Sequence, residues 1–122
     1  MSDFQVERLD HVAVDVADVE RSRAFYAGVL GIKEVPRPAS FDFPGAWFDT
    51  GSGVIHMVQR DPPDTGGQRH FCLWVSNLPA AARAVRAAGF PVRNDGRGSI
   101  PGVDRFYTDD PDGNRIEIQA KS

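Results

Sequence analysis

Three histidines occupy interior positions of segments in which polar and apolar residues alternate, a pattern typical of strands. They are His11, His56 and His70. Glu117 stands in the same kind of position within residues 115–119. Strand interiors are usually apolar, and imidazole and carboxylate groups are common metal ligands. The four residues therefore predict a metal site.

The composition bounds the classes of protein to which the chain can belong. A length of 122 residues fits one domain, and 41% apolar with 25% charged residues is ordinary for a globular protein. The net charge of −3 and scattered basic residues argue against nucleic-acid or anionic-membrane partners. No apolar stretch approaches the roughly 20 residues of a membrane helix, and we find no signal-peptide pattern. The single cysteine, Cys72, excludes an internal disulfide and favours a cytoplasmic protein.

The elements that must carry these residues follow from periodicity and turn signals. Asp18 is a predicted N-cap for a helix that ends at Gly31, and Asn77 is a predicted N-cap for a second helix at 78–88. Strands are predicted at 9–16, 32–35, 46–50, 54–59, 69–75, 90–93, 103–108 and 115–119. Residues 60–68 form a predicted linker rich in Pro, Gly and Asp.

This order repeats, so the chain reads as two tandem βαβββ modules, about 8–59 and 69–119, in a single domain spanning 1–122. His11 and His70 hold the same place in the first strand of each module, and His56 and Glu117 in the last. Because neighbouring side chains alternate between faces, each strand has one apolar face for the helices and one face for the ligands. We expect an α+β fold with a curved mixed sheet and helices on its outer face.

Several segments make the chain similar to a known superfamily, the vicinal oxygen chelate proteins. They are Leu9-Asp10-His11-Val12-Ala13-Val14, the helix Val19-Glu20-Arg21-Ser22-Arg23-Ala24-Phe25-Tyr26 leading to Val29-Leu30-Gly31, and Asp110-Pro111-Asp112-Gly113-Asn114-Arg115-Ile116-Glu117. The superfamily includes glyoxalase I, extradiol dioxygenases, methylmalonyl-CoA epimerase, and fosfomycin and bleomycin resistance proteins. The resemblance covers roughly residues 8 to 119 but does not select a reaction.

The resemblance implies that His11, His56, His70 and Glu117 match the metal ligands of glyoxalase I. Many glyoxalases have a carboxylate where this chain has His56. Glu117 is therefore the only carboxylate among the implied ligands, and the only one that could carry a proton. Such a set suits nickel, cobalt, zinc, manganese or iron and leaves two sites of an octahedron for vicinal substrate oxygens. The metal would stabilise an enediolate while Glu117 acts as the base.

Structural roles remain open for the same residues. Each histidine can instead be a hydrogen-bonded structural residue, His56 can be a substrate contact beside a three-ligand site, and Glu117 can be the polar side of an edge strand. Strand alternation predicts further pocket residues: Trp47, Asp49, Trp74, Arg105 and Tyr107. The tryptophans can instead be packing residues. Arg97 and Arg105 could bind a substrate carboxylate, or they can be solvent-exposed surface residues.

The leading hypothesis is a metal-dependent lyase or isomerase of the glyoxalase I type that acts on a small substrate. An iron(II) extradiol dioxygenase and a non-catalytic antibiotic-binding protein are the alternatives. Glutathione-dependent glyoxalases usually carry an arginine on the first strand for the glutathione carboxylate, whereas this chain has Asp15 there. The resemblance also implies a homodimer, in which His11 and His56 of one chain face His70 and Glu117 of the other. The loop 37–44 is a candidate lid or dimer contact.

Overall fold

Strand β1 (His11–Val16) begins the ordered body of the protein, whose computed structural model describes residues 3–122. The remaining elements follow in the predicted order of two modules. They are α1 (Val19–Arg23), η1 (Ala24–Val29), β2 (Lys33–Val35), β3 (Gly45–Asp49), β4 (Val54–Gln59), β5 (His70–Trp74), α2 (Leu78–Ala87), β6 (Val103–Asp109) and β7 (Arg115–Lys121).

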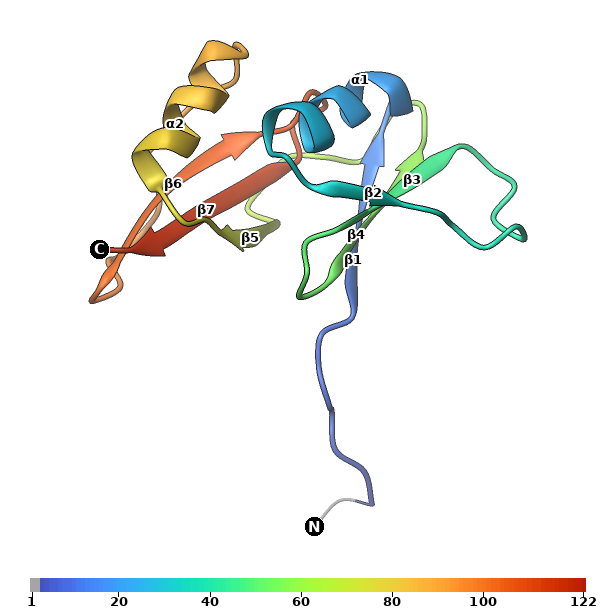
Figure 1. Ribbon diagram of the computed structural model, residues 1–122, viewed down its shortest axis with the longest axis horizontal. Helices are drawn as coiled ribbons and strands as arrows, with labels where there is room; N and C mark the ends of the chain where they lie inside the picture. Colours follow the sequence, from blue (N-terminus) through green and yellow to red (C-terminus); the bar gives the residue numbers. More distant parts are fainter. Residues whose placement is uncertain (1–2) are drawn as a thin grey trace.

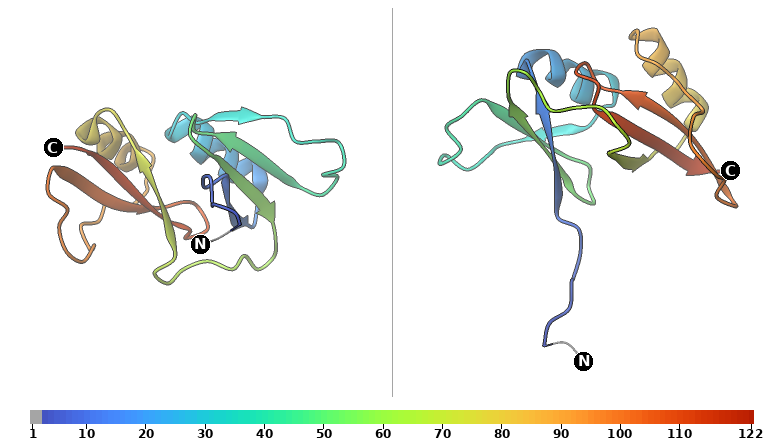
Figure 2. Two further views of the ribbon diagram at one scale, coloured as in Figure 1. Left: turned by 90° about the horizontal axis from the view of Figure 1, so that it is seen from below. Right: turned by 180° about the vertical axis from the view of Figure 1, so that it is seen from behind.

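Each module forms its own sheet. The first has the order β1-β4-β3-β2 and the second the order β5-β7-β6. In both sheets the first strand pairs in parallel with the last, and the remaining pairs are antiparallel. The helices of the two modules lie on the same side of the molecule (Figure 1), and the further views show the two sheets as separate layers joined by the linker (Figure 2). The predicted α+β class with two modules is confirmed, with two sheets in place of one curved sheet.

The helix starts are those that the sequence predicts. The Asp18 carboxylate accepts hydrogen bonds from the backbone N–H groups of Glu20 at 2.9 Å and Arg21 at 3.3 Å, and the Asn77 side chain accepts one from Ala80 at 3.0 Å. Both are N-cap arrangements that satisfy free N–H groups of the first turn. The first helix differs from its prediction, because α1 continues into the π-helix η1 and does not remain α-helical to Gly31.

One predicted strand, 90–93, is not formed. Arg93 makes an isolated antiparallel bridge to Tyr107, and no strand is assigned to this segment. Pro91 explains the difference, because proline has no N–H group to donate to a ladder. The second module therefore has three strands where the first has four.

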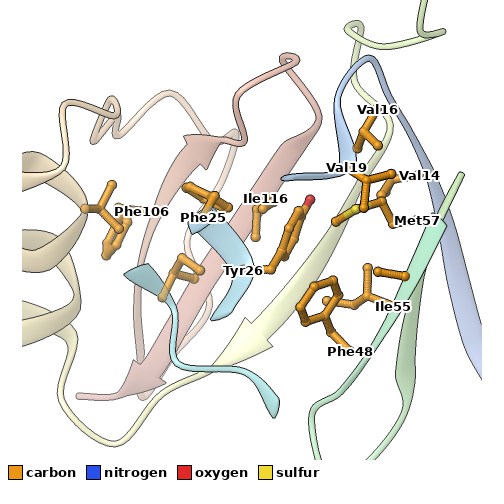
Figure 3. Close-up of a cluster of buried hydrophobic side chains, with 13 residues drawn as sticks. Val14, Val16, Val19, Phe25, Tyr26, Phe48, Ile55, Met57, Phe106 and Ile116 are labelled. Atoms are coloured by element: carbon orange, nitrogen blue, oxygen red, sulfur yellow. The ribbon is translucent and has the colours of Figure 1, made fainter. Parts of the chain in front are cut away.

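A single hydrophobic cluster has members from both modules. Phe25 and Tyr26 of η1 are 1% and 0% exposed, and they lie between side chains of the first sheet and those of the second (Figure 3). The Phe25 ring packs edge-on against Phe90 at 4.6 Å between centroids. The Tyr26 hydroxyl donates a 2.7 Å hydrogen bond to the buried Asp110 carboxylate of the second module. The helix of the first module thus fixes the position of the second.

Residues 3–10 precede β1 as an extended arm that runs away from the body of the protein (Figure 1). Its apolar side chains Phe4, Val6 and Leu9 are 74%, 84% and 75% exposed. The strand predicted from residue 9 accordingly begins at His11. Across residues 3–122, no helix has both the length and the apolar character that a membrane crossing requires.

Candidate metal centre

In the first module, His11 and His56 lie side by side on the ligand face. His56 pairs in register with Ala13, two residues after His11, which places both imidazoles on one face of the parallel β1–β4 pair. The two rings are stacked, with centroids 3.9 Å apart and planes 11° apart. Trp47 of β3 stacks on the other face of His56 at 4.0 Å and 4°. His56 is therefore held between two parallel rings.

The second module repeats this arrangement with a carboxylate. Glu117 pairs in register with Cys72, two residues after His70, so the offset along the parallel β5–β7 pair equals that along β1–β4. His70 Nε2 lies 3.1 Å from Glu117 Oε1. Tyr107 of β6 is opposite Glu117, as Trp47 of β3 is opposite His56. The duplication predicted from the sequence is thus present in the strand register.

Two of the three imidazoles have their Nδ1 atoms engaged by oxygen acceptors. His11 Nδ1 donates to Asp10 Oδ2 at 2.9 Å, and His70 Nδ1 donates to the Gln68 carbonyl at 2.9 Å. Metal-binding histidines commonly donate their second nitrogen in this way, which fixes the tautomer. With Nδ1 as the donor, Nε2 is the nitrogen of each ring that could bind a metal.

Glu117 is buried among donors. Tyr107 Oη donates to Oε1 at 3.0 Å, Arg105 Nη1 donates to Oε2 at 3.3 Å, and Gln119 Nε2 also donates to Oε2. Burial raises the pKa of this carboxyl, but hydrogen bonds from Gln119, Tyr107 and Arg105 outweigh burial and hold the pKa below its usual range. Glu117 is therefore ionised at neutral pH, although its side chain is only 6% exposed.

The donor chemistry of these residues fits a cation. With Nδ1 of His70 committed to Gln68, Nε2 faces the ionised Glu117 carboxylate, a contact that needs a proton or a metal ion between the two atoms. Burial, followed by the neighbouring His11 ring, lowers the pKa of His56, so that its imidazole is neutral and able to bind a metal at neutral pH. Imidazole and carboxylate ligands together suit divalent transition metals.

The two pairs do not converge within one chain. Among residues 3–122, no three His, Cys, Asp or Glu side chains lie close enough together to hold a metal ion. A cavity of about 550 Å³ between β1 and β5 is lined by His11 and His70, but His56 and Glu117 are not among its lining residues. A single chain therefore presents two half-sites, each with two of the predicted ligands.

The remaining predicted residues divide between the half-sites and a separate cavity. Trp47, Arg105 and Tyr107 contact the ligands as described above. Asp49 and Trp74 line a cavity of about 500 Å³ beside the turn after η1, and Trp74 also lines the cavity that contains His11 and His70. Asp49 accepts a hydrogen bond from the Gly51 N–H at 2.8 Å within its own turn. Trp74 is 60% exposed.

Sequence reasoning missed Asp10 and Gln119, which contact His11 and Glu117 respectively. Strand alternation could have indicated Gln119, since it lies two residues beyond Glu117 on the same face. Nothing in the pattern indicates Asp10, because adjacent residues of an extended chain point to opposite sides.

The fold and the paired half-sites define a class: proteins of two repeated modules, each with a histidine on its first strand and a histidine or carboxylate facing it from its last. The model of the Glyoxalase/Bleomycin resistance protein/Dioxygenase superfamily matches residues 8–118. The chain belongs to this superfamily.

Among curated proteins, lactoylglutathione lyase of Salmonella typhimurium is 34% identical over 127 aligned residues. The alignment covers 93% of this chain and 93% of the lyase. Human mitochondrial methylmalonyl-CoA epimerase is 34% identical over 97 residues, which cover 68% of this chain and 54% of the epimerase. The chain thus spans just over half the length of the epimerase. A glyoxalase family protein from Bacillus anthracis has the same fold, with a TM-score of 0.87, 30% identity and full coverage of both chains.

Proposed function

We propose that the protein is a metal-dependent lyase or isomerase of the glyoxalase I type, which binds a small substrate through two adjacent oxygens. The observation that carries this proposal is the repeated half-site. Each module places one pair of candidate ligands at the same two-residue offset across its parallel strands. Nδ1 of His11 and of His70 donates to an oxygen, so Nε2 is the nitrogen of each ring that could bind a metal.

A second copy of the chain would complete the site. β1 and β5 each lie at the edge of a sheet and have no further strand partner among residues 3–122. Both edge strands carry a ligand, His11 on β1 and His70 on β5. In the proposed homodimer, His11 and His56 of one chain face His70 and Glu117 of the other, so that two equivalent sites form. This arrangement accounts for four ligand-type residues that a single chain leaves as separate pairs.

Three imidazoles and one carboxylate would hold nickel, cobalt, zinc, manganese or iron(II). A metal bound there supplies a Lewis acid that stabilises negative charge on a substrate oxygen. The chain's own residues would restrict how the ligands move, because Trp47 stacks on His56 and Asp10 holds His11.

Glu117 is the proposed proton carrier. Its pKa lies below the usual range, so it is ionised and able to accept a proton from a carbon next to a carbonyl group. Tyr107 keeps Oε1 oriented through its hydroxyl. The similarity to an epimerase supports such chemistry, since an epimerase must take a proton from a carbon centre and return it. Proton transfer next to a carbonyl group is therefore the proposed step.

Glutathione is not the proposed cosubstrate. Asp15, which stands where an arginine would bind the glutathione carboxylate, has a negative charge that would repel that group. Its carboxylate accepts hydrogen bonds from Arg60 at 3.2 Å and from the Asp64 N–H at 3.0 Å. A small cytoplasmic substrate with vicinal oxygens fits the proposal better.

Metal analysis of the purified full-length protein, combined with sedimentation, tests the proposal. We expect about one divalent metal per chain and a dimer. Metal-free protein whose stability does not change on addition of nickel, zinc or manganese would favour a non-catalytic binding protein. Iron with oxygen uptake in the presence of catechols would favour a ring-cleaving dioxygenase.

Deuterium exchange into candidate thioesters and hemithioacetals then tests the step itself. Glu117→Gln should retain the hydrogen-bonded shape of the residue and abolish exchange. Cys72→Ser is the matched control, because Cys72 pairs in register with Glu117 and has no proposed role. Full turnover by the Glu117→Gln variant would remove Glu117 from the role of base.

A further inference from the structure

Arg105 of β6 links the Glu117 carboxylate to the glycine-rich loop at residues 94–102. Its Nη2 donates to the carbonyl oxygens of Arg97 at 2.9 Å and Gly98 at 2.6 Å. Its Nη1 donates to Glu117 Oε2 at 3.3 Å and contacts Tyr107 Oη at 3.5 Å. Four of the five N–H groups of the guanidinium are thus directed at protein acceptors. Arg105 is not free to bind a substrate carboxylate in this arrangement.

At Gly96 the loop packs closely against the side chains of Arg105 and Tyr107. A Cβ atom at this position would lie 2.6 Å from Tyr107 Cε2 and 3.0 Å from Arg105 Nη2. Any side chain at position 96 would therefore displace the loop or the Tyr107 and Arg105 side chains. Asp95 anchors the start of the loop through an ion pair with Arg115 at 3.1 Å.

Through Arg105, the loop contributes to how Glu117 presents its two oxygens. With the loop in contact, Arg105 and Gln119 hold Oε2, while Oε1 faces His70 Nε2. If the loop moved away, Arg105 would lose the two carbonyl groups that fix its guanidinium, and Oε2 would lose a directed donor. The carboxylate would then rotate more freely, at a cost to any ligand geometry that uses Oε1.

We propose that Arg105 is a positioning residue that couples the conformation of loop 94–102 to the orientation of Glu117 as a metal ligand. This inference rests on the proposed metal centre and adds to it a loop whose conformation affects one of the ligands. Because coupling between two sites is reciprocal, a change in the loop must alter metal affinity, and metal binding must alter the exchange of loop amides.

Hydrogen exchange of the loop amides and titration with cobalt(II) test the coupling in the full chain. In Arg105→Gln we expect loop amides to exchange at least about tenfold faster in metal-free protein, and cobalt to bind about tenfold more weakly. Arg97→Gln is the matched control, because Arg97 supplies only its backbone carbonyl to the contact. It should resemble the wild-type protein in both measurements.

A second perturbation approaches the contact from the loop. Gly96→Ala retains the Arg105 and Glu117 side chains but places a methyl group against Tyr107 and Arg105, so it should disturb the same contact and reproduce both effects. Arg105→Lys retains the charge without the fork that spans the carbonyls and the carboxylate. It should partly restore cobalt affinity while the loop still exchanges fast, which separates orientation of Glu117 from general folding.

Two results would overturn the coupling: unchanged loop exchange in both Arg105→Gln and Gly96→Ala, or fast exchange with cobalt affinity within about twofold of wild type. A wild-type protein that binds no cobalt would overturn the proposed metal centre and this inference with it. The two kinds of failure are distinguishable, because loop exchange is measured without metal.

Discussion

Subunit complementation provides a direct test of a site shared between two chains. One variant, His11→Ala/His56→Ala, lacks the ligands of the first module, and the other, His70→Ala/Glu117→Gln, lacks those of the second. Neither homodimer retains a complete ligand set, so neither should bind cobalt tightly. The side chains of His11 and His70 are 44% and 34% exposed, so their replacement should leave the fold intact.

The magnitude follows from the two-fold arrangement. In a mixed dimer, one site contains all four substitutions and the other site contains none. Random association of equal amounts makes half of the dimers mixed, and half of their sites are intact, so about one quarter of the sites in the mixture should bind cobalt.

Cobalt bound per chain, measured after the two variants are unfolded together and refolded, is the assay. It does not depend on knowledge of the substrate. Circular dichroism of each variant before mixing controls for folding. If the mixture binds no more cobalt than the separate variants, the shared site is refuted, because a site within one chain cannot be restored by mixing.

Three further predictions concern single residues. Tyr26→Phe removes the buried hydrogen bond to Asp110 and should lower the free energy of unfolding, measured with urea, by about 1–3 kcal/mol. An unchanged free energy of unfolding would contradict the view that this hydrogen bond holds the two modules together. Partial burial raises the pKa of the Cys72 thiol to about 11. Its alkylation by iodoacetamide at pH 8 should therefore be roughly a hundredfold slower than that of free cysteine, and the rate should rise up to about pH 11. A rate that levels off near about pH 8 would refute this. Trp47→Leu removes the ring stacked on His56 and should weaken cobalt binding about tenfold; unaltered binding would show that stacking does not hold the ligand.

Local periodicity was sufficient to predict most elements and to place His11 beside His56 and His70 beside Glu117. Alternation on β1 and β7 placed His11 and Glu117 opposite the apolar faces, because side chains of a strand alternate strictly. The N-caps Asp18 and Asn77 were predictable for a similar reason, since the capping side chain acts within one turn.

Features that depend on packing between distant segments were not predictable. Phe25 and Tyr26 lie in η1 and pack in the core that both modules share. Part of that core comes from the second module, which is distant in sequence. The separation of the ligands into two pairs likewise depends on how the sheets are placed. Repeats reveal which positions are equivalent, but they do not reveal whether equivalent positions meet in one chain.

The core that both modules share has a consequence for the duplication. Phe25 and Tyr26 belong to the first repeat yet contact Phe90 and Asp110 of the second, and Asn114 of the second repeat donates to the Asp15 carbonyl at 2.8 Å. A polypeptide cut in the linker would leave each half with part of its interior uncovered. The two repeats have therefore become interdependent, and a gene that encodes either half alone should yield a product prone to aggregation.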